Sequence, residues 1–251
     1  PDNFNPYNHK LKISYSTYSQ PPIIYEYDLK TNKSKIIKNK KLKNHNPNQY
    51  NEGYFKVGKL IVNYIYHKNK VKLDGKQSYR CYLYGYGAYG VIDDPSFDKY
   101  SLSLVDRGYL CCFPHLRGSK FYGPKWYKDG KILKKKNTFK DFQTTAEYLI
   151  KKNYTTSDKL VIEGGSAGGL LVGACLNMNP SLYNVAIMRV PYVDCLTTML
   201  NPDLPLTSTE YSEWGNPTKY KTHYDYILSY SPYDNINFEK KYPHIFIDTG
   251  L

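Results

Sequence analysis

The sequence predicts an α/β fold: a doubly wound, mostly parallel sheet preceded by a few antiparallel strands. From about Tyr79 onward, short apolar strand patterns alternate with patterns of helical period. Repeated strand–helix–strand units require parallel strands covered by helices. Before that point, residues 1–45 alternate apolar and polar side chains in the manner of strands. With 251 residues, the chain is long enough to bury a substantial core.

The N-terminal part is predicted to contain two or three antiparallel strands, at residues 11–18, 23–28 and 35–38. So few strands are not expected to be stable alone. Residues 44–51, rich in Asn and containing Pro47, are typical of a linker. A hairpin is expected over residues 54–66.

The rest of the chain is predicted to supply the parallel sheet and its helices. Strands are expected at residues 80–86, 109–113, 160–162, 185–190 and 245–248, and helices at 97–106, 138–152 and 168–178. The helix over 138–152 carries one apolar stripe, and Asn137 is its expected N-cap.

A serine between glycines carries the strongest chemical signal. Gly164, Ser166 and Gly168 form G-x-S-x-G between an apolar strand and an apolar helix. This context is typical of a nucleophile elbow, in which the backbone is strained and a side chain on the glycines would collide. Ser166 is the candidate nucleophile, and the Ala167 N–H at the helix start is a candidate oxyanion donor. The alternative is an ordinary Gly-rich turn.

Bulk composition restricts the function classes. The formal net charge is +13, but the basic residues are spread over loops such as 33–43, 125–136 and 219–221, which favours solvated surface over a nucleic-acid face. No apolar run has the length of a membrane span.

Five cysteines without a C-x-x-C pattern predict buried free thiols and a cytoplasmic location. No His/Cys cluster has zinc spacing, and nothing in the sequence calls for a metal or organic cofactor. Because the chain begins at Pro1, a signal peptide on the parent protein stays an open alternative.

Four motifs, the serine motif among them, occur in a characteristic order: Y-G-x-Y-G at 86–90, K-K-N-T-F at 135–139, G-G-S-A-G-G-L-L at 164–171 and E-W-G-N-P at 213–217. Together they resemble the prolyl oligopeptidase family of serine peptidases, and most of all its oligopeptidase B-like members. The resemblance runs from about residue 84 to 251 and is weaker over residues 1–70. It implies that residues 1–45 are the end of a β-propeller and that residues 46–251 belong to an α/β-hydrolase domain.

The resemblance also implies roles for individual residues. Ser166 is the nucleophile, while the Tyr86 hydroxyl and the Ala167 N–H form the oxyanion hole. Tyr89 is expected to wall the substrate pocket. The alternative for Tyr86 is that it is simply one of 29 tyrosines.

Specificity is expected to depend on Glu210. Proline-selective relatives have an aromatic residue at this position, four before Trp214, whereas a carboxylate there selects an Arg or Lys side chain. Oligopeptidase B-like members generally show a second acid where this chain has Ser212, and whether Glu213 compensates is left open. The alternative is that Glu210 is an exposed loop acid.

Arg117 has two interpretations. It either contributes to binding a substrate carboxylate, directly or through a neighbouring residue, or is paired with Asp194. The sequence alone does not separate these alternatives.

A serine nucleophile needs a general base, and the resemblance places the triad acid and histidine beyond Leu251. His223, His244 and Asp248 do not fit those positions. The chain is therefore expected to be a truncated piece, inactive alone, of a serine oligopeptidase that cleaves short peptides after Lys or Arg. An acyl-peptide hydrolase or esterase on the same fold and a degenerate, non-catalytic binding protein are the alternatives.

Overall fold

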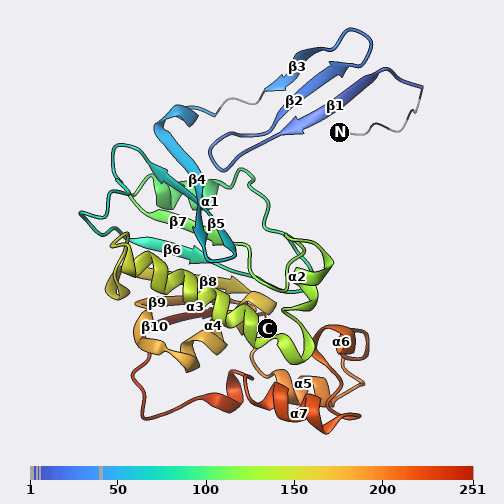
Figure 1. Cartoon of the computed structure of the whole chain (residues 1–251), viewed down its shortest axis with the longest axis vertical. Helices are drawn as coiled ribbons and strands as arrows, with labels where there is room; N and C mark the ends of the chain where they lie inside the picture. Colours follow the sequence, from blue (N-terminus) through green and yellow to red (C-terminus); the bar gives the residue numbers. More distant parts are fainter. Residues whose placement is uncertain (1–2, 4, 6, 40–41, 251) are drawn as a thin grey trace.

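Two sheets organise the chain in the structure, a computed structural model that describes residues 3, 5, 7–39 and 42–250. One is a three-stranded antiparallel sheet and the other has seven strands (Figure 1). Leu251, beyond which the triad acid and histidine were expected, lies outside the described residues, as do residues 1, 2, 4, 6, 40 and 41 of the expected N-terminal segment.

The small sheet has the order β1-β2-β3, with β1 at Lys10–Tyr15, β2 at Ile23–Asp28 and β3 at Lys33–Asn39. It extends from one end of the molecule (Figure 1). The turn after β1 joins it to the larger sheet: Thr17 Oγ1 and the Ser19 N–H donate to Glu52 Oε1 at 2.9 and 2.8 Å, and Tyr18 stacks on Phe113. The predicted antiparallel strands are therefore confirmed.

The seven-stranded sheet has the order β10-β9-β8-β6-β7-β5-β4. Strands β7, β6, β8, β9 and β10 are parallel, whereas β4 and β5 form an antiparallel hairpin at the other edge. The bounds are Tyr50–Val57 for β4, Leu60–His67 for β5, Cys81–Tyr84 for β6, Leu110–Pro114 for β7, Leu160–Gly165 for β8, Val185–Arg189 for β9 and His244–Asp248 for β10. The predicted mostly parallel sheet is confirmed.

Helices cover both faces of this sheet. Their bounds are Lys99–Val105 for α1, Pro124–Lys128 for α2, Lys136–Lys151 for α3, Ala167–Met178 for α4, Cys195–Leu200 for α5, Thr207–Trp214 for α6 and Lys221–Leu228 for α7. Short 3-10 turns occur at Pro47–Gln49, Ile132–Lys134, Ser157–Lys159, Pro180–Leu182 and Tyr233–Asn235. Helices α5, α6 and α7 gather at the end of the molecule opposite the small sheet (Figure 1).

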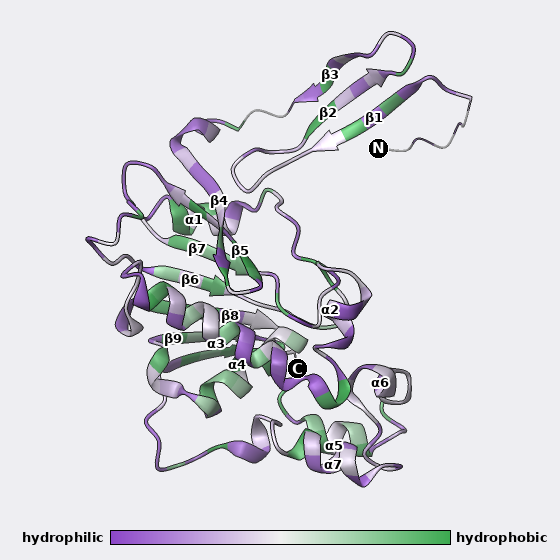
Figure 2. Ribbon diagram, viewed as in Figure 1, coloured by the Kyte–Doolittle hydropathy of each residue, from purple (hydrophilic) through white to green (hydrophobic). Residues whose placement is uncertain are grey.

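Strand alternation divides the interior into two cores. Cys81 and Leu83 of β6 pack with α3 and α4, whereas Tyr82 packs with Leu102 of α1. Successive side chains of a strand point to opposite faces, so each strand contributes to both cores. Hydrophobic colouring follows β6 and β7 in the middle of the sheet (Figure 2). This is the doubly wound arrangement that the sequence predicted.

The expected N-cap of α3 is wrong. Helix α3 begins at Lys136, and Asn137 Nδ2 donates instead to the Asp129 carbonyl at 2.8 Å.

Helices α5 and α6 were not predicted from the sequence, because six to eight residues of mixed polarity carry too little periodicity. Their stability comes mainly from tertiary packing.

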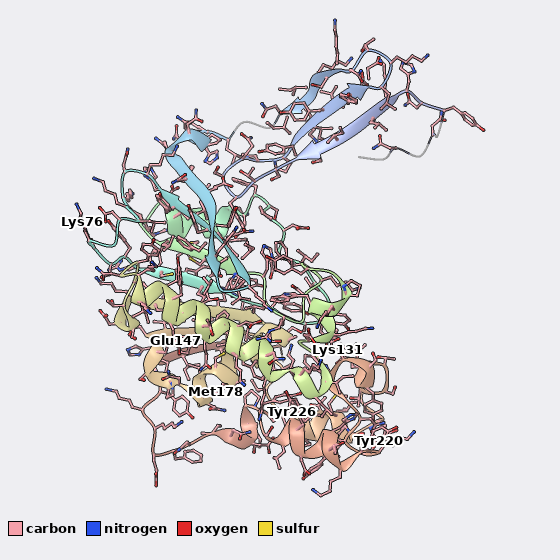
Figure 3. The ribbon with its side chains drawn as sticks, in the orientation of Figure 1. Lys76, Lys131, Glu147, Met178, Tyr220 and Tyr226 are labelled. Atoms are coloured by element: carbon pink, nitrogen blue, oxygen red, sulfur yellow. The ribbon has the colours of Figure 1, made fainter. Side chains whose placement is uncertain are left out.

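The expected state of the cysteines is confirmed, since all five are free and buried. Side chains such as Lys76 and Tyr220 extend outward from the body (Figure 3). Within the part of the chain that the structure describes, every helix is too short or too polar to span a bilayer.

Candidate active site

The G-x-S-x-G motif forms a strained corner between β8 and α4. Ser166 has φ 53° and ψ −117°, a conformation that residues with a side chain rarely adopt. The glycines permit it: a Cβ on Gly164 would overlap the Gly168 carbonyl, and a Cβ on Gly168 would lie 2.5 Å from the Gly85 carbonyl oxygen. Because Ser166 is exposed while the next residue is buried, the corner presents its side chain to solvent. The alternative of an ordinary Gly-rich turn does not describe this geometry.

Backbone hydrogen bonds hold the corner in place. The Ser166 N–H donates to the Arg189 carbonyl at 2.9 Å, and the Ser166 carbonyl accepts from the Tyr192 N–H at 3.1 Å and from the first turn of α4. The Ala167 N–H lies in that first turn, where an amide has no acceptor within its own helix. The positive end of the helix dipole is therefore directed at the space beside Ser166.

Tyr86 lies in the turn that follows β6 and is half-buried. Burial raises the pKa of its phenol, and a hydrogen bond with the Ser166 side chain acts in the opposite direction. The phenol is therefore protonated at neutral pH and able to donate. The structure thus brings together Ser166 and both candidate oxyanion donors, Tyr86 and Ala167.

Glu210 is held by two aromatic side chains. It lies on α6 and is half-buried. Tyr89 Oη donates to its Oε1 at 3.0 Å, and Trp214 Nε1 donates to its Oε2 at 3.0 Å. Burial and the Glu210 carboxylate both raise the pKa of the Tyr89 phenol. The alternative of an exposed loop acid is wrong, because Glu210 is a helical residue with two fixed donors.

Glu213 and Ser212 occupy different environments. Ser212 is exposed, whereas Glu213 is buried. Glu213 accepts from the Tyr89 N–H at 2.9 Å and from the Tyr127 hydroxyl. Its oxygens are engaged inside the protein, so the structure provides no sign that Glu213 replaces the second acid.

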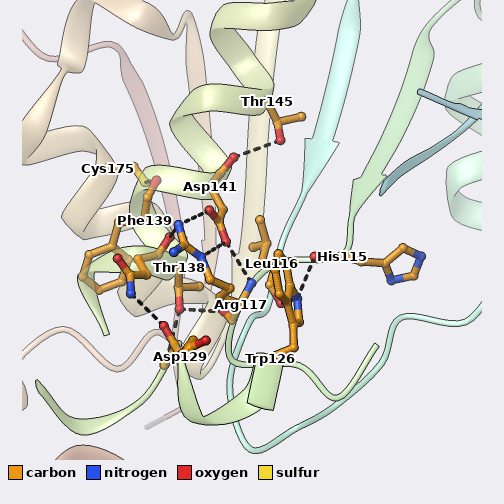
Figure 4. Close-up of polar contacts among 12 residues, drawn as sticks. His115, Leu116, Arg117, Trp126, Asp129, Thr138, Phe139, Asp141, Thr145 and Cys175 are labelled. Carbon is orange, nitrogen blue, oxygen red and sulfur yellow. Dashed lines mark hydrogen bonds and ion pairs between the residues drawn. The ribbon is translucent and has the colours of Figure 1, made fainter. Parts of the chain in front are cut away.

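Arg117 is paired with Asp141, not with Asp194 (Figure 4). Its Nε donates to Asp141 Oδ2 at 2.8 Å and its Nη2 to Oδ1 at 2.5 Å. Asp194 instead accepts from the Thr197 N–H at the start of α5. The alternative of an Arg117–Asp194 pair is therefore wrong, and within the described residues Arg117 makes no hydrogen bond to Ser166, Tyr86 or Glu210. Its role in substrate binding stays a prediction.

His223 and Asp248, neither of which was expected to fit a triad position, have other partners. His223 Nδ1 accepts from the Asn216 N–H at 2.9 Å, while Asp248 accepts from Arg189 Nη1 at 2.9 Å. His244 begins β10 at the opposite end of that strand from Asp248. Over residues 7–39 and 42–250, no histidine is hydrogen-bonded to Ser166, and no group of three or more His, Cys, Asp or Glu side chains is arranged to hold a metal ion.

Lys135 is a residue that the sequence analysis missed. The basic run over 125–136 predicted solvated surface, but Lys135 is 0% exposed and its Nζ donates to the Gly87 carbonyl at 2.7 Å. The expectation of a solvated run is therefore wrong at this position. The K-K-N-T-F motif was the signal that could have singled it out.

Comparison with known proteins supplies an independent result. A sequence model described as "Prolyl oligopeptidase family" matches residues 95–251. Dipeptidyl aminopeptidase BI of Pseudoxanthomonas mexicana is 42% identical over 247 residues, which cover 96% of this chain and 34% of the relative. Protease 2 of Moraxella lacunata is 49% identical over 169 residues, covering 67% of this chain and 24% of the relative. The chain therefore spans about a quarter to a third of the length of these curated relatives.

Solved structures also show similarity to peptidases, here in both fold and sequence. Oligopeptidase B from Trypanosoma brucei, with covalently bound antipain, superposes with a TM-score of 0.89 at 39% identity, covering 96% of this chain and 34% of that one. Oligopeptidase B from Leishmania major superposes with a TM-score of 0.87 at 38% identity and the same coverage.

Proposed function

This chain belongs to the prolyl oligopeptidase family, and from that premise we propose that the full-length protein is a serine oligopeptidase that cleaves short peptides after Lys or Arg. We also propose that residues 1–45 end a β-propeller and that residues 46–251 belong to the catalytic domain. The five buried free thiols favour a reducing, cytoplasmic location.

In the proposed reaction, Ser166 Oγ attacks the scissile carbonyl and a tetrahedral intermediate forms. The Tyr86 hydroxyl and the Ala167 N–H stabilise its oxyanion, and one such donor typically contributes about 2.7–4 kcal/mol to the transition state. A histidine from the rest of the full-length protein takes the Ser166 proton and returns it to the leaving amine. The observation that supports this proposal most directly is the strained, solvent-exposed Ser166 corner, whose Gly168 packs against the backbone of Gly85 and Tyr86.

Glu210 supports the preference for a basic side chain. Its two hydrogen bonds fix the carboxylate, so little conformational entropy is lost when a substrate guanidinium or ammonium group binds. A charge-assisted hydrogen bond would stabilise that complex. Because Ser212 is uncharged, we expect a weaker preference than two acids would produce.

The nucleophile is tested with a serine-directed fluorophosphonate on the full-length protein. Ser166→Ala is expected to abolish labelling, because the attacking oxygen is gone. Labelling of this variant at the wild-type level would refute the assignment.

The pocket is tested by comparing kcat/KM for peptides with Arg and with uncharged residues at the cleavage site. Glu210→Gln is expected to reduce kcat/KM for the Arg peptide about 10- to 100-fold, as expected for loss of a charged hydrogen-bond partner of about 1.5–3 kcal/mol. Glu147→Gln, on the exposed face of α3, is the matched control (Figure 3). An unchanged Arg preference in Glu210→Gln would contradict the proposed pocket.

A second candidate function is the release of dipeptides from free N-termini, which the 42% identity to dipeptidyl aminopeptidase BI favours. Peptides with free and blocked N-termini distinguish it from endopeptidase activity. Acetylated and ester substrates test the acyl-peptide hydrolase and esterase alternatives in the same assay. A full-length protein that neither labels nor turns over any of these would support the non-catalytic alternative.

A further inference from the structure

The loop that carries Tyr86 has an unusual backbone. Gly87, Tyr89 and Gly90 have φ values of 68°, 56° and 73°. Positive φ is rare for a bulky residue such as Tyr89 and persists only where surrounding contacts enforce it. The segment from Tyr86 to Tyr89, named here the tyrosine loop, therefore requires contacts from other residues that stabilise this backbone. These contacts are called anchors below.

Lys135 is the first anchor. Its side chain is fully buried, and its Nζ donates to the Gly87 carbonyl at 2.7 Å. The same ammonium group lies over the Trp214 ring, 5.1 Å from the centroid. A buried cation binds its acceptor more strongly than an exposed one, because water does not compete.

Glu213 is the second anchor. It is 2% exposed, and its Oε1 accepts from the Tyr89 N–H at 2.9 Å. Its Oε2 accepts from the Tyr127 hydroxyl and lies 3.9 Å from Lys131 Nζ. One buried cation and one buried anion thus bind backbone groups two residues apart in the tyrosine loop.

The two charges also support each other. Burial lowers the pKa of Lys135 to about 8, and the Glu213 carboxylate is the main influence in the opposite direction. Lys135 is consequently protonated for the most part at neutral pH. A buried charge is tolerated when hydrogen bonds and a nearby opposite charge compensate for lost hydration. Lys135 donates to the Gly87 carbonyl, and Glu213 accepts two hydrogen bonds and lies 3.9 Å from Lys131 Nζ.

We propose that Lys135 and Glu213 are positioning residues that hold the tyrosine loop, so that the Tyr86 phenol meets Ser166 while the Tyr89 phenol meets Glu210. The inference rests on the proposed peptidase function and deepens it. One anchored segment sets both the oxyanion donor and the specificity carboxylate. Loss of an anchor therefore impairs turnover of every substrate, whereas loss of Glu210 impairs only basic ones.

The test uses Lys135→Met in the full-length protein, with Lys134→Met as matched control. Lys134 is the preceding residue, but its side chain is 59% exposed and paired with Asp129. In Lys135→Met, kcat per active site, counted by fluorophosphonate titration, is expected to fall about 10²–10³-fold, the effect of losing one oxyanion donor. The same factor in kcat is expected for Arg and uncharged peptides, while KM rises for the Arg peptide alone, because the Tyr89 phenol that fixes Glu210 moves with the loop. Lys134→Met is expected to match wild type.

Glu213→Gln keeps a carbonyl oxygen for the Tyr89 N–H, so it provides a milder variant if Lys135→Met fails to fold. It is expected to lower kcat for both peptides by one common factor. In the variant that combines Lys135→Met and Glu213→Gln, the two losses in kcat are expected not to add, because both residues act on one loop. Wild-type kcat per active site in Glu213→Gln and in any folded Lys135→Met would overturn the positioning role of Lys135 and Glu213 and leave the proposed function standing. A wild-type protein without turnover or Ser166 labelling would overturn the proposed function and, with it, the positioning role.

Discussion

Ser166 and Tyr89 share positive φ values, at 53° and 56°, although neither is glycine. Such strain persists only when neighbouring contacts compensate for it, and it is frequent at functional sites. For Ser166 the compensation comes from the Arg189 carbonyl and the first turn of α4. For Tyr89 it comes from Glu213 and Glu210. At the scale of single residues, the candidate site is thus held partly by hydrogen bonds to residues far away in the sequence, Arg189 for Ser166 and Glu210 and Glu213 for Tyr89.

A prediction at this scale concerns the Tyr86 hydroxyl. Tyr86→Phe keeps the ring but removes the donor beside Ser166, so kcat is expected to fall about 10²–10³-fold with KM little changed. Tyr100→Phe is the control, since Tyr100 is 73% exposed. Steady-state kinetics of the full-length protein provides the measurement, and wild-type kcat in Tyr86→Phe would remove Tyr86 from the oxyanion hole.

At the scale of elements, the β8–α4 corner shows why a strand and a helix can meet so closely. Helix α4 is buried over nearly its whole length, and its first turn packs against the end of β6. A Cβ on Gly168 would lie 2.5 Å from the Gly85 carbonyl oxygen and 3.4 Å from Tyr86 Cα. The spacing of β6 and α4 therefore depends on a missing side chain, and the position of Tyr86 depends on that spacing.

Gly168→Ala is expected to push these two elements apart, which lowers the free energy of unfolding by about 1–3 kcal/mol and weakens fluorophosphonate labelling of Ser166. Urea denaturation of both variants measures the first effect. Gly165→Ala is the control for stability, because its Cβ would meet its nearest neighbour at an ordinary 3.5 Å. Equal stability of the two variants would contradict the predicted collision.

At the scale of the whole molecule, buried titratable groups link folding to pH. His115 is 3% exposed, stacks on Phe121 and contacts Asn63 Nδ2 at 3.0 Å. Burial lowers the pKa of His115 to about 4 from an ordinary value of 6.5. Between pH 4 and 6.5 the unfolded chain binds more protons at this site, so its contribution to stability is lost as the pH falls through this window. Asp93, with a pKa raised to about 6, has the opposite slope over part of the range.

His115→Phe keeps the stacking on Phe121 and removes the titrating group. The free energy of unfolding of this variant is expected to depend less on pH between 4 and 6.5 than that of wild type. Urea denaturation at several pH values measures both curves, and because Asp93 is common to both, their difference isolates His115. Parallel curves would show that His115 does not titrate as inferred.

The sequence by itself determined the sheet, the strand–helix alternation and the Ser166 corner. Each of these depends on neighbouring residues: the period of apolar side chains, or glycines at fixed offsets. The sequence also indicated Tyr86 and Glu210, but only through their motifs. It misjudged Asn137, whose side chain bonds to a carbonyl eight residues away instead of capping α3.

Only the tertiary structure decided the partners of charged residues. Glu213 binds the Tyr89 N–H across 124 positions, and Lys135 binds the Gly87 carbonyl across 48. In the sequence, Lys135 is one of several adjacent lysines, and Arg117 has more than one acid available. Whether a charge is buried and stabilised depends on the atoms that surround it in three dimensions, and no local pattern specifies those atoms.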